Sequence, residues 1–353
     1  MQSEPRRVLI VRIGAMGDIL HAMPAVAALR QENPAWEIGW VVEPRWLPLL
    51  KAAELDSGRP LLDRTYLAAT REWKQRPLSL QTVKAIAALR REMRAGGFDL
   101  CVDMQGSIRS AMIGQMSGAE NLVGPQEPRE RPARWMYGRR IELRRLHVIE
   151  QGCELLGGAV GENLQPTKIR FAVSETVVRT CNTILSKSLD ANHKLALLAP
   201  TAGWGAKQWP AERFGAVAAK LGRQGVRSIV NASREDDGIA QKVVEASDGY
   251  ATVVVADLPQ LIEFTRRASV VVAGDTGPLH LAAALERPVV ALFGPTDPTR
   301  NGPYGTRARV LRYGGERRDH RRLKEPEAGL LAIPVEEVVE AAMGLLTSDP
   351  LIS

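Results

Sequence analysis

The sequence predicts an α/β protein of two Rossmann-like, doubly wound domains in tandem. The chain has 353 residues, enough for two domains at about 100–200 residues each. Short Val-, Leu- and Ile-rich runs alternate with longer helical stretches, and such runs are typical of strands buried on both faces of a parallel sheet. Glycine-containing turns join several of these strands to the following helices, as in βα units.

The first domain, placed at residues 1–170, opens with a complete βα unit. A buried strand is followed by a glycine turn at 14–18 and by an apolar helical stretch to about residue 30. The strands expected in this domain are 8–11, 38–42 and 98–103. The stretch from about 158 to 175 has the composition of a linker, which sets the end of the domain.

The second domain, placed at residues 171–333, repeats this pattern more cleanly. Its expected strands are 195–199, 228–231, 252–255, 269–273 and 289–293. The helices expected between them are 211–223, 237–247, 259–267 and 278–286. Pro334 then opens a last helix, placed at 334–353, with apolar residues at helical spacing. Ligands of such sheets bind at the carboxyl ends of the strands, so a cleft between the two domains is the expected site.

The composition favours a soluble, cytosolic protein. Hydrophobic residues make up 45% and charged residues 25% of the chain, which excludes global disorder. The three cysteines, Cys101, Cys153 and Cys181, are too far apart for a disulfide framework and lack metal-site spacing. The start has no secretory signal, and no apolar run approaches the roughly 18 residues of a membrane helix.

Positive charge is concentrated in the first domain. Residues 1–170 contain 25 Lys/Arg and 19 Asp/Glu, a net charge of +6, and the remaining 22 basic and 21 acidic residues leave +1. This excess predicts an anionic partner: nucleic acid, an anionic membrane surface, or a phosphorylated or carboxylated substrate. Nucleic acid is the least favoured, because few aromatic residues accompany the basic ones. The candidate cations are Arg64, Arg71, Lys74, Arg76 and the arginine-rich stretch 129–145, which includes Arg134.

The first candidate motif is the glycine turn at 14–18. Gly14 and Gly17 allow the backbone to approach a ligand, and Asp18 is a candidate general base. Alternatively, Asp18 only caps the following helix. The spacing is not G-x-G-x-x-G, which counts against a dinucleotide fingerprint.

The second motif, GDTGPLH at 274–280, directly follows an expected strand. Asp275, Thr276 and Gly277 precede a helix whose N-terminus offers N–H groups and a positive dipole to a diphosphate. His280 adds a possible donor. The alternative is an Asp helix cap with proline in the first turn and a packed histidine.

The third motif, TAGWGAKQWP at 201–210, also follows an expected strand. Thr201 lies at its start, and Lys207 would supply positive charge to a leaving phosphate unless it is an ordinary solvated lysine. Glu235, after the next strand, could accept hydrogen bonds from ribose hydroxyls, although it also fits a helix start. No cluster has convincing metal-ligand spacing, so neither a metal nor a cofactor is expected.

These motifs resemble those of glycosyltransferase family 9, the ADP-heptose:lipopolysaccharide heptosyltransferases. The resemblance rests on VLIVRIGAMGDILHAMPAVAALR at the start, KQWP at 207–210, and GDTGPLHLAAAL followed by RPVVALFGPTDP. It spans both domains in the same order. Within the family, residues 16–21 are most similar to heptosyltransferase I, which adds the first heptose to Kdo of the inner core. Some of those sequences have two serines where this chain has Gly14 and Ala15.

The resemblance implies a GT-B fold in which the C-terminal helix packs back on the first domain. It also implies an inverting, metal-independent transferase with an N-terminal acceptor-binding and a C-terminal ADP-sugar-binding domain. Asp18 would then be the base, and Lys207 would stabilise the leaving ADP together with the helix start at 275–280. The residues expected to bind the donor are Gly14, Gly17, Thr201, Glu235, Asp275, Thr276, Gly277 and His280. The expected partners are ADP-heptose, a Kdo-lipid A type acceptor and the anionic inner leaflet of the inner membrane, without nucleic acid.

Four alternatives remain open at this point. The chain could be heptosyltransferase II or another ADP-sugar transferase of the same family. It could be a nucleotide-dependent dehydrogenase, because Glu43 ends the second strand near the expected place of a ribose-binding acid. It could be a sugar-nucleotide epimerase, which would need no acceptor. It could also be a non-catalytic nucleotide-binding module, which would be indifferent to substitution of Asp18.

Overall fold

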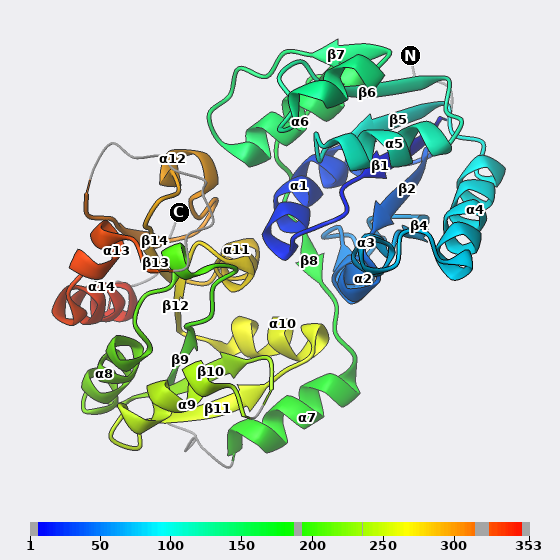
Figure 1. Ribbon diagram of the computed structural model, residues 1–353. Helices are drawn as coiled ribbons and strands as arrows, with labels where there is room; N and C mark the ends of the chain where they lie inside the picture. Colours follow the sequence, from blue (N-terminus) through cyan, green and yellow to red (C-terminus); the bar gives the residue numbers. More distant parts are fainter. Residues whose placement is uncertain (1–5, 187–192, 235, 315–324, 348–353) are drawn as a thin grey trace. The chain divides into compact units, whose positions relative to one another are not determined.

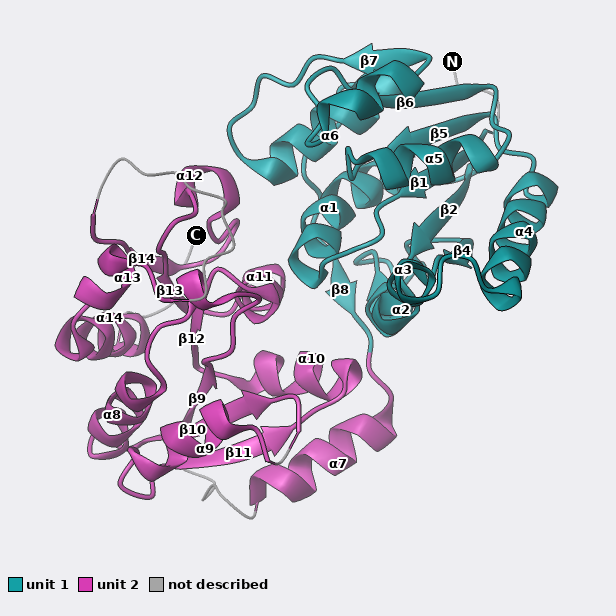
Figure 2. Cartoon of the chain, in the orientation of Figure 1, with its two compact units in different colours: residues 1–172 teal, residues 173–353 magenta. Residues whose placement is uncertain are grey.

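The computed structural model describes residues 6–186, 193–234, 236–314 and 325–347. Its strands and helices largely alternate along the chain (Figure 1). They form two compact units, residues 1–172 and 173–353, and each unit is described by itself (Figure 2). The division lies close to residue 170, where the sequence places the end of the first domain.

Unit 1 contains a sheet of six parallel strands in the order β4-β2-β1-β5-β6-β7. The strands are β1 (Arg7–Val11), β2 (Glu37–Val42), β4 (Arg64–Leu67), β5 (Leu100–Asp103), β6 (Asn121–Pro125) and β7 (Arg139–Ile141). In the centre, Val8 of β1 is in register with Ile38 of β2 and with Leu100 of β5. Residues 8–11 are buried without alternation, because helices cover both faces of the sheet.

The helices of unit 1 form one layer on each face of this sheet. On one face, α1 (Met16–Glu32) packs against α6 (Val148–Val160). On the other face lie α4 (Leu80–Ala95), α5 (Ile108–Met116) and the 3-10 helix η2 (Arg131–Met136), which share one hydrophobic core with β1, β5 and β6. The remaining elements are η1 (Pro44–Trp46), α2 (Leu47–Ala52), α3 (Thr70–Gln75) and the antiparallel pair β3 (Ala53–Glu54) and β8 (Arg170–Phe171).

Unit 2 repeats this architecture with the strand order β11-β10-β9-β12-β13-β14, again all parallel. The strands are β9 (Lys194–Ala199), β10 (Val226–Ala232), β11 (Ala251–Val255), β12 (Val270–Gly274), β13 (Val289–Leu292) and β14 (Ala308–Leu311). The helices are α7 (Glu175–Ser186), η3 (Gly205–Lys207), α8 (Ala211–Gly222), α9 (Gly238–Glu245), α10 (Leu258–Arg267), α11 (Gly277–Ala284), α12 (Pro298–Asn301), α13 (Ala328–Ala332) and α14 (Val335–Thr347). The predicted class of two doubly wound α/β domains is therefore confirmed.

The last helix, α14, has its apolar side buried in the core of unit 2, against α8 and strands β12 to β14. The residues on this side are Val338, Val339, Ala342 and Leu345. They cover the part of the sheet that α8 and α9 leave open, so α14 belongs to unit 2. Packing of the C-terminal helix on the first domain, which the resemblance implies, stays a prediction. Residues 348–353 of the predicted helix lie outside the described part of the chain.

The two sheets determine where ligand-binding residues can lie. In each unit the strand order reverses between two central strands, β1 and β5 in unit 1 and β9 and β12 in unit 2. Ligands of doubly wound sheets bind at the carboxyl ends of the strands beside this reversal. Across the described residues, no helix combines the length and hydrophobicity that crossing a membrane requires.

Candidate active site

In unit 2, the loops after β9 and β12 bring three predicted residues together. The ammonium of Lys207 donates to a carboxylate oxygen of Asp275, and it also lies 3.4 Å from the Asp275 carbonyl oxygen. The other carboxylate oxygen of Asp275 lies 3.1 Å from Nε2 of His280. All three side chains are at most one tenth exposed. Residues from two separate motifs therefore form one hydrogen-bonded cluster at the strand-order reversal.

Asp275 is held ionised inside this cluster. Burial alone would raise its pKa, but the hydrogen bond and charge of His280 and the positive charge of Lys207 outweigh burial and hold the pKa well below the ordinary value. A buried carboxylate that stays ionised fixes the direction of the ammonium and the imidazole. It cannot itself attract a diphosphate, so we interpret Asp275 as the residue that positions Lys207 and His280.

The loop that carries Lys207 is fixed from two sides. The Lys207 ammonium lies 4.5 Å from the centroid of the Trp204 ring, a cation–π contact. At the end of β12, a Cβ on Gly274 would lie 3.2 Å from the Lys207 carbonyl oxygen. The close approach of the two loops therefore favours glycine at this position, which sequence reasoning noted only as part of a motif.

The other predicted residues of unit 2 lie around this cluster. Thr276 is the N-cap of α11 and Gly277 its first residue, but the Thr276 hydroxyl donates back to the Gly274 carbonyl at 3.2 Å and makes no cap bond. Pro278 has no N–H, and the N–H groups of Leu279 and His280 donate to the Thr276 carbonyl at 3.1 and 3.4 Å. The donor that the start of α11 offers beside Lys207 is therefore the N–H of Gly277. Thr201 follows β9 at the same edge of the sheet. Glu235 lies outside the described residues.

In unit 1, the candidate base Asp18 lies in the first turn of α1, at the end of β1. One of its carboxylate oxygens accepts from the Ala15 N–H at 3.0 Å, and the other lies 3.0 Å from an Arg12 guanidinium nitrogen. The helix-capping alternative is therefore realised. It does not exclude chemistry, because the Asp18 side chain remains 36% exposed and each carboxylate oxygen can accept more than one hydrogen bond.

Sequence reasoning missed the residues that hold the Asp18 turn. Gln105, in the loop after β5, accepts from the backbone N–H groups of Ile13 and Gly14 through its side-chain oxygen. In the same loop the Met104 carbonyl accepts from Arg12, the residue that also pairs with Asp18. The loops after the two central strands of unit 1 are thus hydrogen-bonded to each other, as expected at a strand-order reversal.

The β5 loop is itself anchored by the fully buried Asp103. Its carboxylate accepts from the N–H groups of Gln105 and Gly106, from the Ser110 hydroxyl and from the Tyr137 hydroxyl, at 2.8 to 3.1 Å. Burial raises the pKa of Asp103, although these four hydrogen bonds oppose the rise. The polar sequence DMQG at the end of a strand was the available signal for this site.

The predicted acceptor-side cations divide into two groups. Arg64 begins β4, so it lies at the amino edge of the sheet, where it pairs with Glu37 at 2.6 Å. The structure thus separates it from Asp18, which follows the carboxyl end of β1. The other cations follow the carboxyl ends of β4 and β6 and so belong to the Asp18 edge of unit 1; they are Arg71, Lys74, Arg76 and Arg134.

Glu43, which the dehydrogenase alternative needs as a ribose ligand, has another role. It is buried, and one carboxylate oxygen accepts from the Thr70 hydroxyl at 2.5 Å and from the Arg71 N–H at 2.9 Å. Glu43 therefore caps the start of α3.

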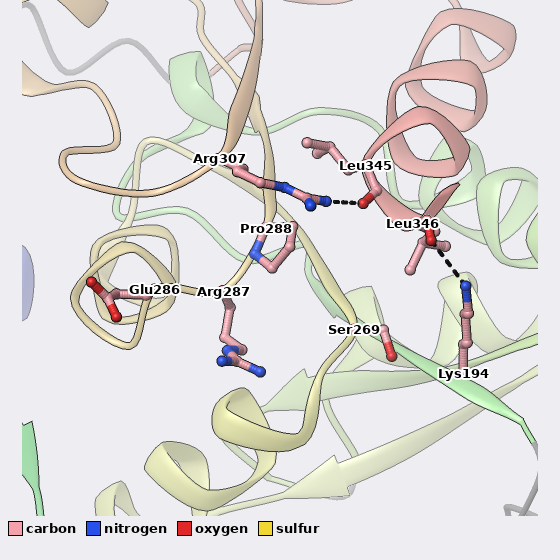
Figure 3. A pocket seen from close by; sticks show the side chains of 8 residues that line it. All are labelled: Lys194, Ser269, Glu286, Arg287, Pro288, Arg307, Leu345 and Leu346. Carbon is pink, nitrogen blue, oxygen red and sulfur yellow. Dashed lines mark hydrogen bonds between the residues drawn. The ribbon is translucent and has the colours of Figure 1, made fainter. Parts of the chain in front are cut away.

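A cavity of about 350 Å³ in unit 2 lies away from these residues (Figure 3). Its lining comes from the amino ends of the strands and the end of α14: Lys194, Ser269, Glu286, Arg287, Pro288, Arg307, Leu345 and Leu346. Lys194 and Arg307 donate to the carbonyl oxygens of the last turn of α14, as Figure 3 shows. These cations thus stabilise the helix C-terminus. In the part of the chain that the structure describes, no three His, Cys, Asp or Glu side chains are grouped to hold a metal.

Comparison with known proteins decides the family. Residues 86–329 match the family described as glycosyltransferase family 9 (heptosyltransferase), which is more than half of the chain. The chain belongs to glycosyltransferase family 9. This family 9 glycosyltransferase is 30% identical over 319 residues to lipopolysaccharide heptosyltransferase 1 of Escherichia coli O18:K1:H7, with 88% of this chain and 92% of that protein covered.

Solved structures agree with this assignment. A glycosyl transferase family 9 protein from Veillonella parvula superposes with a TM-score of 0.82 at 22% identity, covering 98% of both chains. The E. coli heptosyltransferase WaaC with ADP-2-deoxy-2-fluoro heptose gives a TM-score of 0.73 at 26% identity, covering 95% of this chain and 99% of that one. The family 9 glycosyltransferase thus has the GT-B fold, and the dehydrogenase, epimerase and non-catalytic alternatives are not supported.

Proposed function

We propose that this family 9 glycosyltransferase is a heptosyltransferase of the lipopolysaccharide core, of the heptosyltransferase I type, which transfers heptose from ADP-heptose to Kdo. The observation that carries the proposal is the Lys207–Asp275–His280 cluster beside the start of α11. It supplies an oriented ammonium and an imidazole beside a helix N-terminus with the Gly277 N–H, which together suit the diphosphate of a nucleotide-sugar. The names of the E. coli relatives support heptose as the sugar.

The proposed reaction is a single displacement with inversion. Asp18 accepts the proton of the acceptor hydroxyl as that oxygen bonds to the anomeric carbon of the heptose. The bond from this carbon to the ADP oxygen breaks, and its electron pair leaves with ADP. Lys207 and the N-terminus of α11, with the Gly277 N–H, stabilise the charge that develops on the diphosphate. Since these groups supply the positive potential, we propose that the reaction needs neither a metal nor another cofactor.

The remaining predicted residues take supporting roles in this proposal. Thr201, Thr276 and Gly277 surround the diphosphate site, with His280 held in place by Asp275. Glu235 is proposed to accept from the ribose hydroxyls. The backbone at Gly14 and Gly17 is proposed to contact the donor. On the acceptor side, Arg71, Lys74, Arg76 and Arg134 are proposed to bind the acidic Kdo-lipid A type acceptor. The enzyme would act in the cytoplasm, peripheral to the inner membrane.

The test measures ADP release from ADP-heptose with and without Kdo-lipid A. We expect ADP to appear only with acceptor, and Asp18→Asn to abolish turnover while ADP binding, measured by calorimetry, persists. Asp56→Asn, which changes an exposed loop aspartate, is the matched control and should be fully active. Turnover like that of the wild type in Asp18→Asn would refute its role as the base. If only an acceptor that already carries heptose is used, the chain is instead of the heptosyltransferase II type.

A further inference from the structure

Unit 1 exposes an unusual number of large apolar side chains on the layer formed by α4, α5 and η2. Leu78, directly before α4, is 93% exposed, and Trp135 of η2 is 77% exposed. Half of the twelve exposed large hydrophobic residues in the described part of the chain lie on this layer: Leu78, Leu80, Val83, Ile108, Met112 and Trp135. We call these six residues and the surface between them the α4–α5 face. Three of them, Leu78, Leu80 and Val83, lie within six residues at the start of α4, and neighbouring exposed apolar groups mark an interaction surface.

Two apolar residues of α4, Leu80 and Val83, do not contribute to the core of unit 1. The side of α4 that packs on the sheet carries Thr82, Leu89 and Met93. The opposite side, at helical spacing, carries Leu80, Val83, Lys84, Ala87 and Arg91, all exposed. A surface helix normally has polar residues on its outward side. The packing of unit 1 therefore does not explain why leucine and valine alternate with cations on the outward side of α4.

The charge around this apolar surface has one dominant sign. Residues 70–94 contain two acidic residues, Glu72 and Glu92, and seven basic ones: Arg71, Lys74, Arg76, Lys84, Arg90, Arg91 and Arg94. All seven are exposed, and within the described residues none of them forms an ion pair. Around η2 the signs are more even, with Glu127 and Glu130 beside three arginines. The complementary partner is therefore an anionic surface that also accepts apolar side chains.

We infer that the α4–α5 face docks on an anionic lipid bilayer, with Leu78, Leu80 and Val83 entering the headgroup region. Apolar and tryptophan side chains favour the boundary between headgroups and acyl chains, and lysine and arginine bind the lipid phosphates beside them. A second copy of the chain fits less well, because it would bring two cationic surfaces together. The inference rests on the proposed function for its biological setting, and it names the surface through which that enzyme would meet the membrane.

The position of this face in unit 1 suits a lipid-anchored acceptor. The N-terminal ends of α4 and α5 lie at the carboxyl edge of the sheet, because these helices follow β4 and β5 along the chain. Asp18 lies at the same edge, at the start of α1. Leu78, Leu80 and Ile108 are thus on the side of the layer nearest to that edge. An acceptor whose hydroxyl reaches Asp18 could keep its acyl chains in the bilayer beneath this face.

The test measures binding of the full chain to vesicles that contain neither acceptor nor nucleotide-sugar. Vesicles of phosphatidylcholine mixed with phosphatidylglycerol are compared with phosphatidylcholine alone by co-sedimentation. We expect the wild type to prefer the anionic vesicles, and Leu78→Ser/Leu80→Ser/Val83→Ser to lose about ten-fold or more in partitioning. The matched control is Val310→Ser/Leu331→Ser, which removes two exposed apolar residues of unit 2 and should bind like the wild type.

A second pair of variants tests the charge. Lys84→Glu/Arg91→Glu should weaken binding to anionic vesicles and reduce its salt dependence, whereas Lys242→Glu/Arg309→Glu in unit 2, with the same net charge, should not. Wild-type binding by the triple serine variant, with its fold verified by circular dichroism, would overturn the inference. Loss of a dimer in that variant, seen by sedimentation, would assign the face to a second copy instead.

Failure of this inference and failure of the proposed function give different results. Vesicle binding is measured without any transfer reaction, so it can succeed in a protein that transfers no heptose. Conversely, the triple serine variant should retain transfer to a deacylated, water-soluble acceptor and lose it selectively with acceptor embedded in vesicles. Equal loss with both acceptors would show that these residues act on catalysis or folding and not on membrane docking, which would also overturn the inference.

Discussion

The side-chain oxygen of Gln105 accepts a hydrogen bond from the backbone N–H of Gly14 at 3.4 Å, and another from Ile13 at 3.1 Å. Gly14 begins the turn that leads to Asp18, and Gln105 lies in the loop after the neighbouring central strand. The position of the candidate base thus depends on a side chain about ninety residues away in the sequence. Asp103 in turn holds the Gln105 loop through its buried carboxylate.

We predict that Gln105→Leu lowers kcat about 10- to 100-fold, because displacing a catalytic group by about 1 Å can cost that much. The variant leaves the N–H groups of Ile13 and Gly14 without their acceptor, so the Asp18 turn shifts. ADP affinity should stay unchanged, since the proposed diphosphate site lies in unit 2. Gln105→Glu keeps an acceptor oxygen and should restore part of the activity. Steady-state kinetics with calorimetry separates the two effects.

The control for this prediction is Gln224→Leu, which removes an exposed glutamine whose amide donates one long hydrogen bond, of 3.4 Å, to the Lys220 carbonyl. It should have the kinetics of the wild type. If Gln105→Leu raised KM for the donor and left kcat intact, a positioning role toward Asp18 would be excluded.

Lys207→Ala should weaken ADP binding about 10- to 100-fold, the cost of losing a hydrogen bond to a charged group. The substitution also leaves the carboxylate of Asp275 with only His280 as its partner in the cluster. Lys207→Arg retains the charge and should recover part of the affinity. Lys220→Ala, which removes an exposed lysine paired with Glu336, is the matched control. Calorimetric titration with ADP measures the affinity. Unchanged affinity in Lys207→Ala would show that Lys207 does not bind ADP and is an ordinary loop lysine.

The sequence predicts the strands of unit 2 closely because both sheet faces are covered. Burial on both sides produces continuous Val and Leu runs, and β9 to β13 lie within about two residues of the expected positions. The edge strand β14 was missed, since its ARVL sequence is short and half exposed. In unit 1, the strand ending at Asp103 was predicted from alternation, yet all four of its residues are buried, Asp103 among them.

The sequence predicts which site residues share an edge of the sheet, because these residues directly follow strands. It does not predict which of their side chains touch. Lys207 and Asp275 each follow a predicted strand, and parallel strands bring such loops to one edge of the sheet. Their direct contact, and the contact of Gln105 with Gly14, depend on rotamers and loop conformations that no local pattern specifies. The packing of α14 in the core of unit 2 was not predictable for a related reason: its apolar side identifies a buried helix and does not identify the surface that buries it.

The stability of unit 2 should depend on pH through Asp275. The pKa of this carboxyl is lowered in the folded state, so its stabilising contribution is complete above the ordinary aspartate pKa of about 3.9 and is lost as pH falls below that value. We expect Asp275→Asn to lower the free energy of unfolding by about 1–3 kcal/mol at pH 7. The difference from the wild type should stay constant down to about pH 5 and shrink below about pH 4. Urea unfolding monitored by tryptophan fluorescence measures this difference in the free energy of unfolding. A difference that does not change with pH in this range would contradict a lowered pKa of Asp275.

Gly14→Ala should destabilise unit 1 by about 1–3 kcal/mol, the typical cost of overpacking and of an unfavourable backbone conformation. Gly14 has φ of +153°, and a Cβ there would lie 2.7 Å from Nε1 of Trp46. The indole would have to move, and the Asp18 turn with it, so kcat should fall together with stability. Gly344→Ala, at an exposed position inside α14 with open space around its Cβ, is the matched control. Because alanine has the higher helix propensity, this control should gain about 0.5–1 kcal/mol. Urea unfolding of both variants gives the comparison, and a Gly14→Ala protein as stable and active as the wild type would show that the turn tolerates a side chain at this position.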